Sequence, residues 1–214
     1  MKSKLKKEAK EKHFRVAVFG SARIKKNGLE YKLIYKLAKM VAAENIDIVT
    51  GGGQGLMAAA SSGHHAGRKN RKVHSIGLNI KLPMEQKFNG HLDIKKEFSR
   101  FSERLDNFMQ LSNAVVVAPG GVGTMLEFFY TWQLVQVKHI CDIPVILLGE
   151  MWLDLLKWIR KWPLENGLID KKDFNLLFFA KNPEDAMKII KLTHEEYKKG
   201  GKNICLNIKK YKIT

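Results

Sequence analysis

The chain has 214 residues, of which 45% are hydrophobic and 28% are charged, a balance that is typical of globular proteins and excludes disorder throughout. Its longest apolar runs fall far short of the roughly 18 residues that a membrane span needs, so we expect no membrane segment. The formal net charge is +17, and ten of these charges lie in two lysine-rich ends.

The charged ends suggest how the chain is divided. We interpret residues 1–13 as a basic N-terminal tail, residues 14–197 as a single domain and residues 198–214 as a basic C-terminal tail. Solvated tails are the interpretation that we favour, with nucleic-acid binding as the alternative. No apolar run follows the basic start as it would in a secretory signal, so we expect a cytoplasmic protein. Cys141 and Cys205 lack the spacing of a disulfide framework or a metal site, and we expect reduced thiols.

Strand and helix signals alternate along the first part of the domain. Short apolar runs bounded by turn residues predict strands over residues 16–19, 46–50 and 73–78. Apolar residues at helical spacing predict helices over residues 29–44 and 56–66. Residues 81–98 carry a proline, a glycine and scattered charges, which predict a long loop that could act as a lid over a site.

The alternation continues toward the C-terminus. We expect strands over residues 114–118 and 144–148. We expect helices over residues 100–113, 124–137 and 151–162. Pro163 is predicted to end the last of these, and residues 176–179 form a further apolar segment. Asn182 is predicted to cap a final helix, with Pro183 at its first position.

This order of elements predicts an α/β fold: a doubly wound, mostly parallel sheet with helices on both faces. In such sheets ligands bind beyond the carboxyl ends of the strands. Two glycine-rich turns follow predicted strands and open predicted helices, so both would lie at that edge. The sequence therefore predicts a site between the two turns.

The first turn is TGGGQGLM at residues 50–57. Backbone N–H groups at the start of a helix can face an anion, and glycines allow the close approach. Gly53, Gly55 and Ala58 also match the dinucleotide pattern G-x-G-x-x-A, but the acidic residue that such a site needs is missing near Asn79. A purely structural tight turn therefore stays open for this segment.

The second turn is PGGVGT at residues 119–124, and Glu127 follows three residues later. Thr124 could add a hydroxyl donor, and Glu127 can face the same pocket from the first turn of the helix. The alternative is that Glu127 only interacts with the positive N-terminal end of the helix. Neither turn ends in the Gly-Lys-Ser/Thr of a P-loop, which disfavours a Mg-ATP motor or kinase.

Together, these segments resemble the Lonely Guy (LOG) family of cytokinin riboside 5′-monophosphate phosphoribohydrolases, whose older label is lysine decarboxylase. The strongest element is P-G-G-x-G-T-x-x-E, complete here at residues 119–127. Supporting elements in the same order are FGSAR at 19–23, TGGG at 50–53 with Gly55 and Met57, Leu82-Pro83 with Glu85-Gln86 and Asn89, and QLVQ at 133–136. The family's arginine fifteen residues before the motif proline corresponds to Arg104. The resemblance covers most of residues 15–160.

The resemblance implies a Rossmann-like homodimer that hydrolyses the N-glycosidic bond of a purine nucleoside 5′-monophosphate, including N6-substituted adenine nucleotides, to free base and ribose 5-phosphate. It implies no metal and no organic cofactor. Glu127 and Arg104 would be catalytic, because a carboxylate can stabilise the positive charge that develops on the ribose and can orient water. The candidate phosphate or ribose contacts are Ser21, Gly52, Gly53, Gly120, Gly121, Gly123 and Thr124.

The chain departs from the family pattern at Ala58, where an acid is common, and at Leu105, where a lysine is common. These departures motivate an alternative function, a non-catalytic nucleotide or molybdenum-cofactor carrier or sensor on the same fold. Decarboxylation has no support, since no signature for a pyridoxal phosphate lysine is visible. His64 and His65 do not share a helix face, and we expect surface histidines there.

Overall fold

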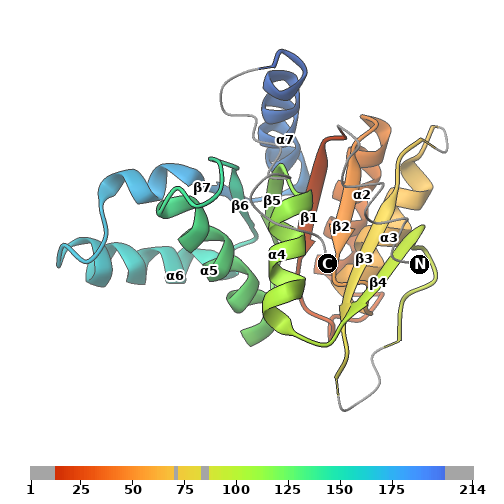
Figure 1. The fold of residues 1–214 in the computed structure, drawn as a ribbon, viewed down its shortest axis with the longest axis horizontal. Coiled ribbons are helices and arrows are strands. Elements are labelled where there is room, and N and C mark those ends of the chain that lie inside the picture. Colours follow the sequence, from red (N-terminus) through yellow and green to blue (C-terminus); the bar gives the residue numbers. More distant parts are fainter. Residues whose placement is uncertain (1–12, 70–71, 83–86, 201–214) are drawn as a thin grey trace.

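The structure is a computed structural model that describes residues 13–69, 72–82 and 87–200. Within these residues, seven parallel strands form one sheet in the order β4-β3-β2-β1-β5-β6-β7 (Figure 1). The strands are β1 (Arg15–Phe19), β2 (Asp47–Thr50), β3 (Ser75–Ile80), β4 (Ile94–Phe98), β5 (Ala114–Val117), β6 (Val145–Leu148) and β7 (Leu177–Ala180). The strand order changes direction between β1 and β5, which confirms the predicted doubly wound fold.

Helices cover both faces of this sheet. The helices are α2 (Leu29–Ala43), α3 (Leu56–Gly67), α4 (Phe101–Leu111), α5 (Val122–Gln136), α6 (Met151–Ile159) and α7 (Pro183–Lys198). Helices α2, α3 and α7 pack on the face that carries Val16 and Val18, and α4, α5 and α6 pack on the face that carries Ala17 and Phe19. In Figure 1, α4 lies in front of the sheet, and α2 and α3 lie behind it.

The central strands are apolar because both of their faces are covered. All four residues of β5, Ala-Val-Val-Val, are buried, as expected for a central parallel strand whose side chains enter both cores. At roughly 1.5–3 kcal/mol for each fully buried Val or Leu side chain, such strands supply much of the hydrophobic stabilisation. They hold the β1 and β5 ends, and hence the loops that follow them, in fixed positions.

Two sequence predictions are wrong at the edges of these elements. The loop predicted over residues 81–98 ends in β4, an edge strand in which only Ile94 and Phe98 are buried, so its charged residues hide the strand signal. Pro163 does not end the helix begun by α6, because the chain continues as a π-helical segment, η1 (Arg160–Leu164), around it. In an α-helix the proline ring clashes with the carbonyl four residues earlier, and the helix past α6 departs from α-helical geometry at this position.

Other predicted features are confirmed or lie outside the described residues. Asn182 caps α7 by accepting the Asp185 N–H at 2.8 Å, and Pro183 occupies the first turn. The prediction of reduced thiols is not confirmed, since Cys205 lies outside the described residues. Most of both predicted tails, residues 1–12 and 201–214, also lies outside them. Among the described helices, none has the length and apolar character to span a membrane.

Candidate active site

A cavity of about 580 Å³ opens where the direction of the strand order changes, at the carboxyl ends of β1 and β5. This is the edge at which doubly wound sheets bind ligands, and the volume suits a small-molecule ligand. Glycine-rich backbone, apolar side chains and a few charged side chains line it. The lining residues include Ser21, Arg23, Gly51, Met57, Asn79, Leu82, Phe101, Arg104, Gly121, Val122, Gly123, Thr124 and Glu127.

The loop after β1 lies between the two glycine turns and connects them. The Ser21 N–H donates to the Pro119 carbonyl at 3.1 Å, and the Ser21 carbonyl accepts the Leu56 N–H at 2.9 Å. Gly55, at a φ of +64°, lies so close that a Cβ there would collide with the Ser21 carbonyl oxygen. Ser21 itself lines the cavity, with its hydroxyl oxygen accepting the Arg23 N–H at 3.0 Å.

Part of the backbone of the first turn is hydrogen-bonded within the protein. The Gly52 N–H donates to the Thr50 hydroxyl oxygen at 3.1 Å. The Asn89 side-chain amide donates to the carbonyls of Gly52 and Gly53 at 3.1 and 3.0 Å. Only Gly51 and Met57 of residues 50–57 line the cavity. The structure therefore does not bring the predicted contacts Gly52 and Gly53 to it.

The second turn is open toward the cavity. Four consecutive residues of the turn line it, namely Gly121, Val122, Gly123 and Thr124. A Cβ at Gly121 or Gly123 would meet no other atom within 4 Å, whereas one at Gly120 would collide with the Thr124 side chain. Gly120 does not line the cavity, and its role is to let Thr124 fold back. Because a helix leaves its first N–H groups without intrahelical partners, the start of α5 can receive an anion.

Arg104 of α4 and Glu127 of α5 meet inside the cavity. Arg104 Nη2 lies 2.9 Å from Glu127 Oε1, and the two side chains are only 8% and 10% exposed. The Arg104 guanidinium also lies 5.5 Å from the Phe108 ring centroid, within cation–π range. Burial raises the pKa of Glu127 to about 7, since the loss of hydration outweighs the opposing effect of Arg104. The carboxyl can therefore exchange a proton near neutral pH.

The structure adds cavity residues that sequence reasoning did not assign. Arg23 brings a second guanidinium, and Phe101, Leu82 and Met57 supply apolar surface. Asn79 is buried at the end of β3, with its side-chain oxygen accepting the Ile80 N–H at 3.0 Å. The end of a parallel strand is a position where such a polar residue could have been found from the sequence.

The neighbouring histidines do not belong to this cavity. His64 is fully buried rather than at the surface, and one of its ring nitrogens lies 2.9 Å from the carbonyl oxygen of Ile46, which directly precedes β2. Burial lowers the pKa of His64 to about 4, so the ring is neutral at pH 7. His65 is exposed, as expected.

Comparisons with known proteins give the same family from sequence. A family model described as "Possible lysine decarboxylase" matches residues 57–190. A rice (Oryza sativa subsp. japonica) protein named "Probable cytokinin riboside 5′-monophosphate phosphoribohydrolase LOGL2" is 30% identical over 86% of this chain and 72% of its own length. The Arabidopsis thaliana protein named cytokinin riboside 5′-monophosphate phosphoribohydrolase LOG3 is 29% identical over 88% of this chain and 85% of its own length.

Solved structures agree with the fold. The molybdenum cofactor binding protein from the phototrophic bacterium Rippkaea orientalis aligns with a TM-score of 0.64 over 84% of this chain and 96% of its own. The two sequences are 21% identical, so the likeness concerns the fold alone.

Proposed function

Because the chain belongs to the LOG family, we propose that it hydrolyses the N-glycosidic bond of a purine nucleoside 5′-monophosphate, including nucleotides of N6-substituted adenine. The observation that carries the proposal is the buried Arg104–Glu127 pair beside the open second turn. A buried carboxyl with a raised pKa is costly to keep and is typical of catalytic sites.

The pair supplies what this hydrolysis needs. When the bond between the ribose C1′ and the base breaks, its electron pair leaves with the base and positive charge develops on the ribose. An ionised Glu127 stabilises that charge and accepts a proton from the water that attacks C1′. The departing base takes one proton from solvent, and Glu127 returns its own proton to solvent, so one water is consumed in all. Arg104 keeps part of the Glu127 population ionised and can contact the phosphate, ribose or base.

The start of α5 is the proposed phosphate site. The N–H groups of Gly121, Val122 and Gly123 and the Thr124 hydroxyl are the proposed donors, and Ser21 and Arg23 line the same cavity. No acidic residue lies in the first turn of α5, so the helix dipole is left to attract the anion. Phe101 and Leu82 line the cavity with apolar surface and are the proposed contacts to the flat base.

Two observations favour the hydrolase over the carrier alternative. Leu105 is 4% exposed in the core, and neither it nor Ala58 lines the cavity, so these two departures from the family pattern replace no residue that lines it. Both proposed catalytic residues, Arg104 and Glu127, line the cavity and contact each other.

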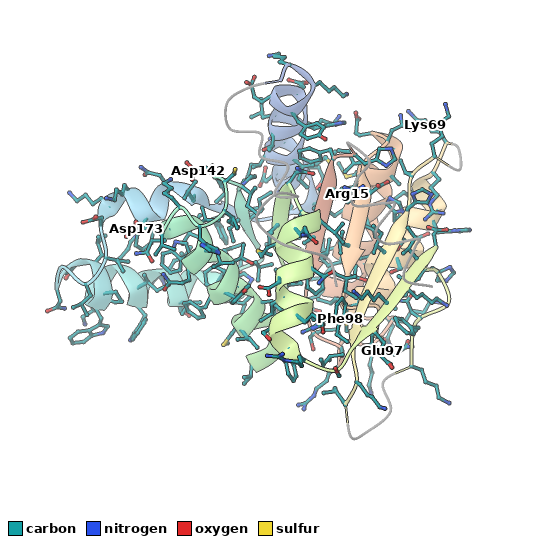
Figure 2. All side chains as sticks on the ribbon, in the orientation of Figure 1. Arg15, Lys69, Glu97, Phe98, Asp142 and Asp173 are labelled. Carbon is teal, nitrogen blue, oxygen red and sulfur yellow. The ribbon has the colours of Figure 1, made fainter. Side chains whose placement is uncertain are left out.

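The test is product formation. Pure protein is incubated with AMP and N6-substituted AMP, and free base and ribose 5-phosphate are measured by chromatography. Glu127→Gln is expected to lower kcat/KM by about 10²–10³-fold, in the range found when one transition-state electrostatic partner is removed. Glu97→Gln removes an exposed carboxylate at the same edge of the sheet and serves as the matched control (Figure 2). Tight nucleotide binding without release of base, unchanged by Glu127→Gln, would instead support the carrier.

We also propose that a second copy of the chain covers the outer face of α5. Val122, Leu126 and Phe129 are exposed on one face of this helix, and Val122 is 85% exposed. A groove between α5 and α6 brings Phe129 and Trp158 together, which extends the apolar surface. Because Val122 also lines the cavity, a partner on this surface would approach the proposed active site. This arrangement agrees with the homodimer that the family resemblance implies.

The oligomeric state tests this surface. Sedimentation velocity is expected to give a dimer for the unaltered protein and a monomer for Phe129→Glu. Leu192→Glu places the same charge at an exposed leucine of α7, on the other face of the sheet, and should stay dimeric. If the unaltered protein is a monomer at assay concentration, the proposed dimer surface is wrong.

A further inference from the structure

Three potential metal ligands meet at the edge of the sheet opposite the cavity. His13 precedes β1, Asp47 is the first residue of β2, and His74 directly precedes β3. The register pairs Arg15 with Asp47 and Ile48 with Ser75, so the amino ends of these three adjacent strands lie side by side. Figure 2 labels Arg15 at this edge and Phe98, the last residue of β4, at the other.

The ligand atoms of this His–Asp cluster, formed by His13, Asp47 and His74, all lie within 4.8 Å of one another. His13 Nδ1 is 3.2 Å from Asp47 Oδ2. Ligands around a tetrahedral Zn²⁺ are spaced by roughly 3.3 Å, given metal–ligand distances of about 2.0–2.1 Å. The His13–Asp47 pair already has this spacing, and modest rotation of the side chains can shorten the distances to His74.

A hydrogen bond holds the Asp47 carboxylate in an orientation that suits a metal ligand. Asp47 is 1% exposed, and its Oδ1 accepts the His74 N–H at 2.8 Å, which leaves Oδ2 directed toward His13. Such outer hydrogen bonds orient metal ligands and strengthen metal binding. The two histidines are only partly buried, so an ion can reach the cluster from solvent.

We propose that the His–Asp cluster binds one divalent transition-metal cation, with Zn²⁺ as the natural probe. Two imidazoles and one carboxylate form a donor set that suits Zn²⁺ and leaves a fourth position for water. The ion would fasten the segment before β1 to β2 and β3, which makes it a stabilising site rather than a part of the hydrolytic cavity. The proposal is independent of the proposed function.

The guanidinium of Arg15 limits the metal affinity that we expect. Arg15 Nε lies 3.6 Å from Asp47 Oδ2, and the metal competes with this guanidinium for the same oxygen. Moderate rather than very tight binding follows. The alternative is that Asp47 forms ion pairs with Arg15 and His13 and binds no metal. The experiment must distinguish this alternative from metal binding.

The experiment uses the full chain without a polyhistidine tag. Zn²⁺ binding is measured by calorimetry, Co²⁺ binding by its visible absorption, and thermal unfolding with and without Zn²⁺. We expect one ion per chain and a rise of the unfolding temperature. Each of His13→Gln and His74→Gln should weaken binding at least about tenfold, because even outer-shell partners contribute that much.

The matched control removes other histidines. His65 and His91 are exposed neighbours with ring centroids 5.7 Å apart, and the double variant His65→Gln, His91→Gln should bind Zn²⁺ like the unaltered protein. The His13 side chain is 38% exposed, so its replacement should not prevent folding, which circular dichroism verifies. Absence of saturable binding up to millimolar Zn²⁺, or binding that survives in His13→Gln and His74→Gln, would overturn the proposal.

Discussion

The two glycine-rich turns occupy equivalent places after β2 and β5, but their backbone groups are used differently. In the first turn, the Gly52 N–H is bound by Thr50, the Gly52 and Gly53 carbonyls are bound by Asn89, and the Leu56 N–H is bound by Ser21. In the second turn, four consecutive residues line the cavity, and Gly121 and Gly123 face open space.

This difference shows that a glycine turn at a helix N-terminus is not by itself an anion site. Its N–H groups can attract a phosphate only if the surrounding chain leaves them accessible. Here the loop after β1 fills the space in front of the first turn and presents Ser21 to the cavity instead. The first turn supports the site, and the second turn forms it.

Gly55→Ala should give the largest effect on stability. Gly55 has a φ of +64°, which L residues rarely adopt, and a Cβ would collide with the Ser21 carbonyl. The free energy of unfolding should fall by an amount on the order of 3 kcal/mol, measured by urea denaturation. Gly90→Ala, where a Cβ meets nothing within 4 Å, is the control. Equal denaturation midpoints for the two variants would contradict a structural role for the first turn.

Gly123→Ala should separate binding from stability in the second turn. Gly123 lies in α5 with open space before it, so alanine should leave the free energy of unfolding unchanged or raise it by up to about 1 kcal/mol. The added methyl group stands where the phosphate would approach, and we expect about tenfold weaker nucleotide binding, or about 1.4 kcal/mol. Calorimetric titration with AMP measures this, and unchanged affinity would place the phosphate elsewhere.

The smallest expected effect is on the pH dependence of kcat/KM. If ionised Glu127 acts, kcat/KM should rise with pH around about 7 and then level off. Arg104→Met removes the cation that lowers the pKa of Glu127, so the rise should move to higher pH. A kcat/KM that instead falls as pH rises through 7 would show that the protonated form is the active one.

The same raised pKa has a consequence for stability. Folded Glu127 holds its proton more tightly than the unfolded chain does, so its stabilising contribution is complete below pH 4.5 and is lost as pH rises through about 7. Denaturation curves measured across this window should show that dependence in the unaltered protein, and Glu127→Gln should lack it.

Local sequence signals predicted most of the strands and helices. They failed where tertiary contacts determine the secondary structure. Buried strands such as β5 are continuous apolar runs, and the start of α7 carries its own cap in Asn182. In contrast, β4 exists because it pairs with β3, and its three consecutive charged residues resemble a loop when seen alone. The η1 segment past Pro163 was likewise invisible to a rule that expects proline to end a helix.

By itself, the sequence determined the doubly wound order, the two glycine turns and, through the family resemblance, the candidates Arg104 and Glu127. The tertiary structure alone decided which turn faces the cavity. Hydrogen bonds from the Asn89 side chain to the first turn, and from the Leu56 N–H to Ser21, join residues some 35 positions apart in the chain. No local pattern encodes such contacts, because they depend on how the loop after β1 and the connection between β3 and β4 pack against the first turn.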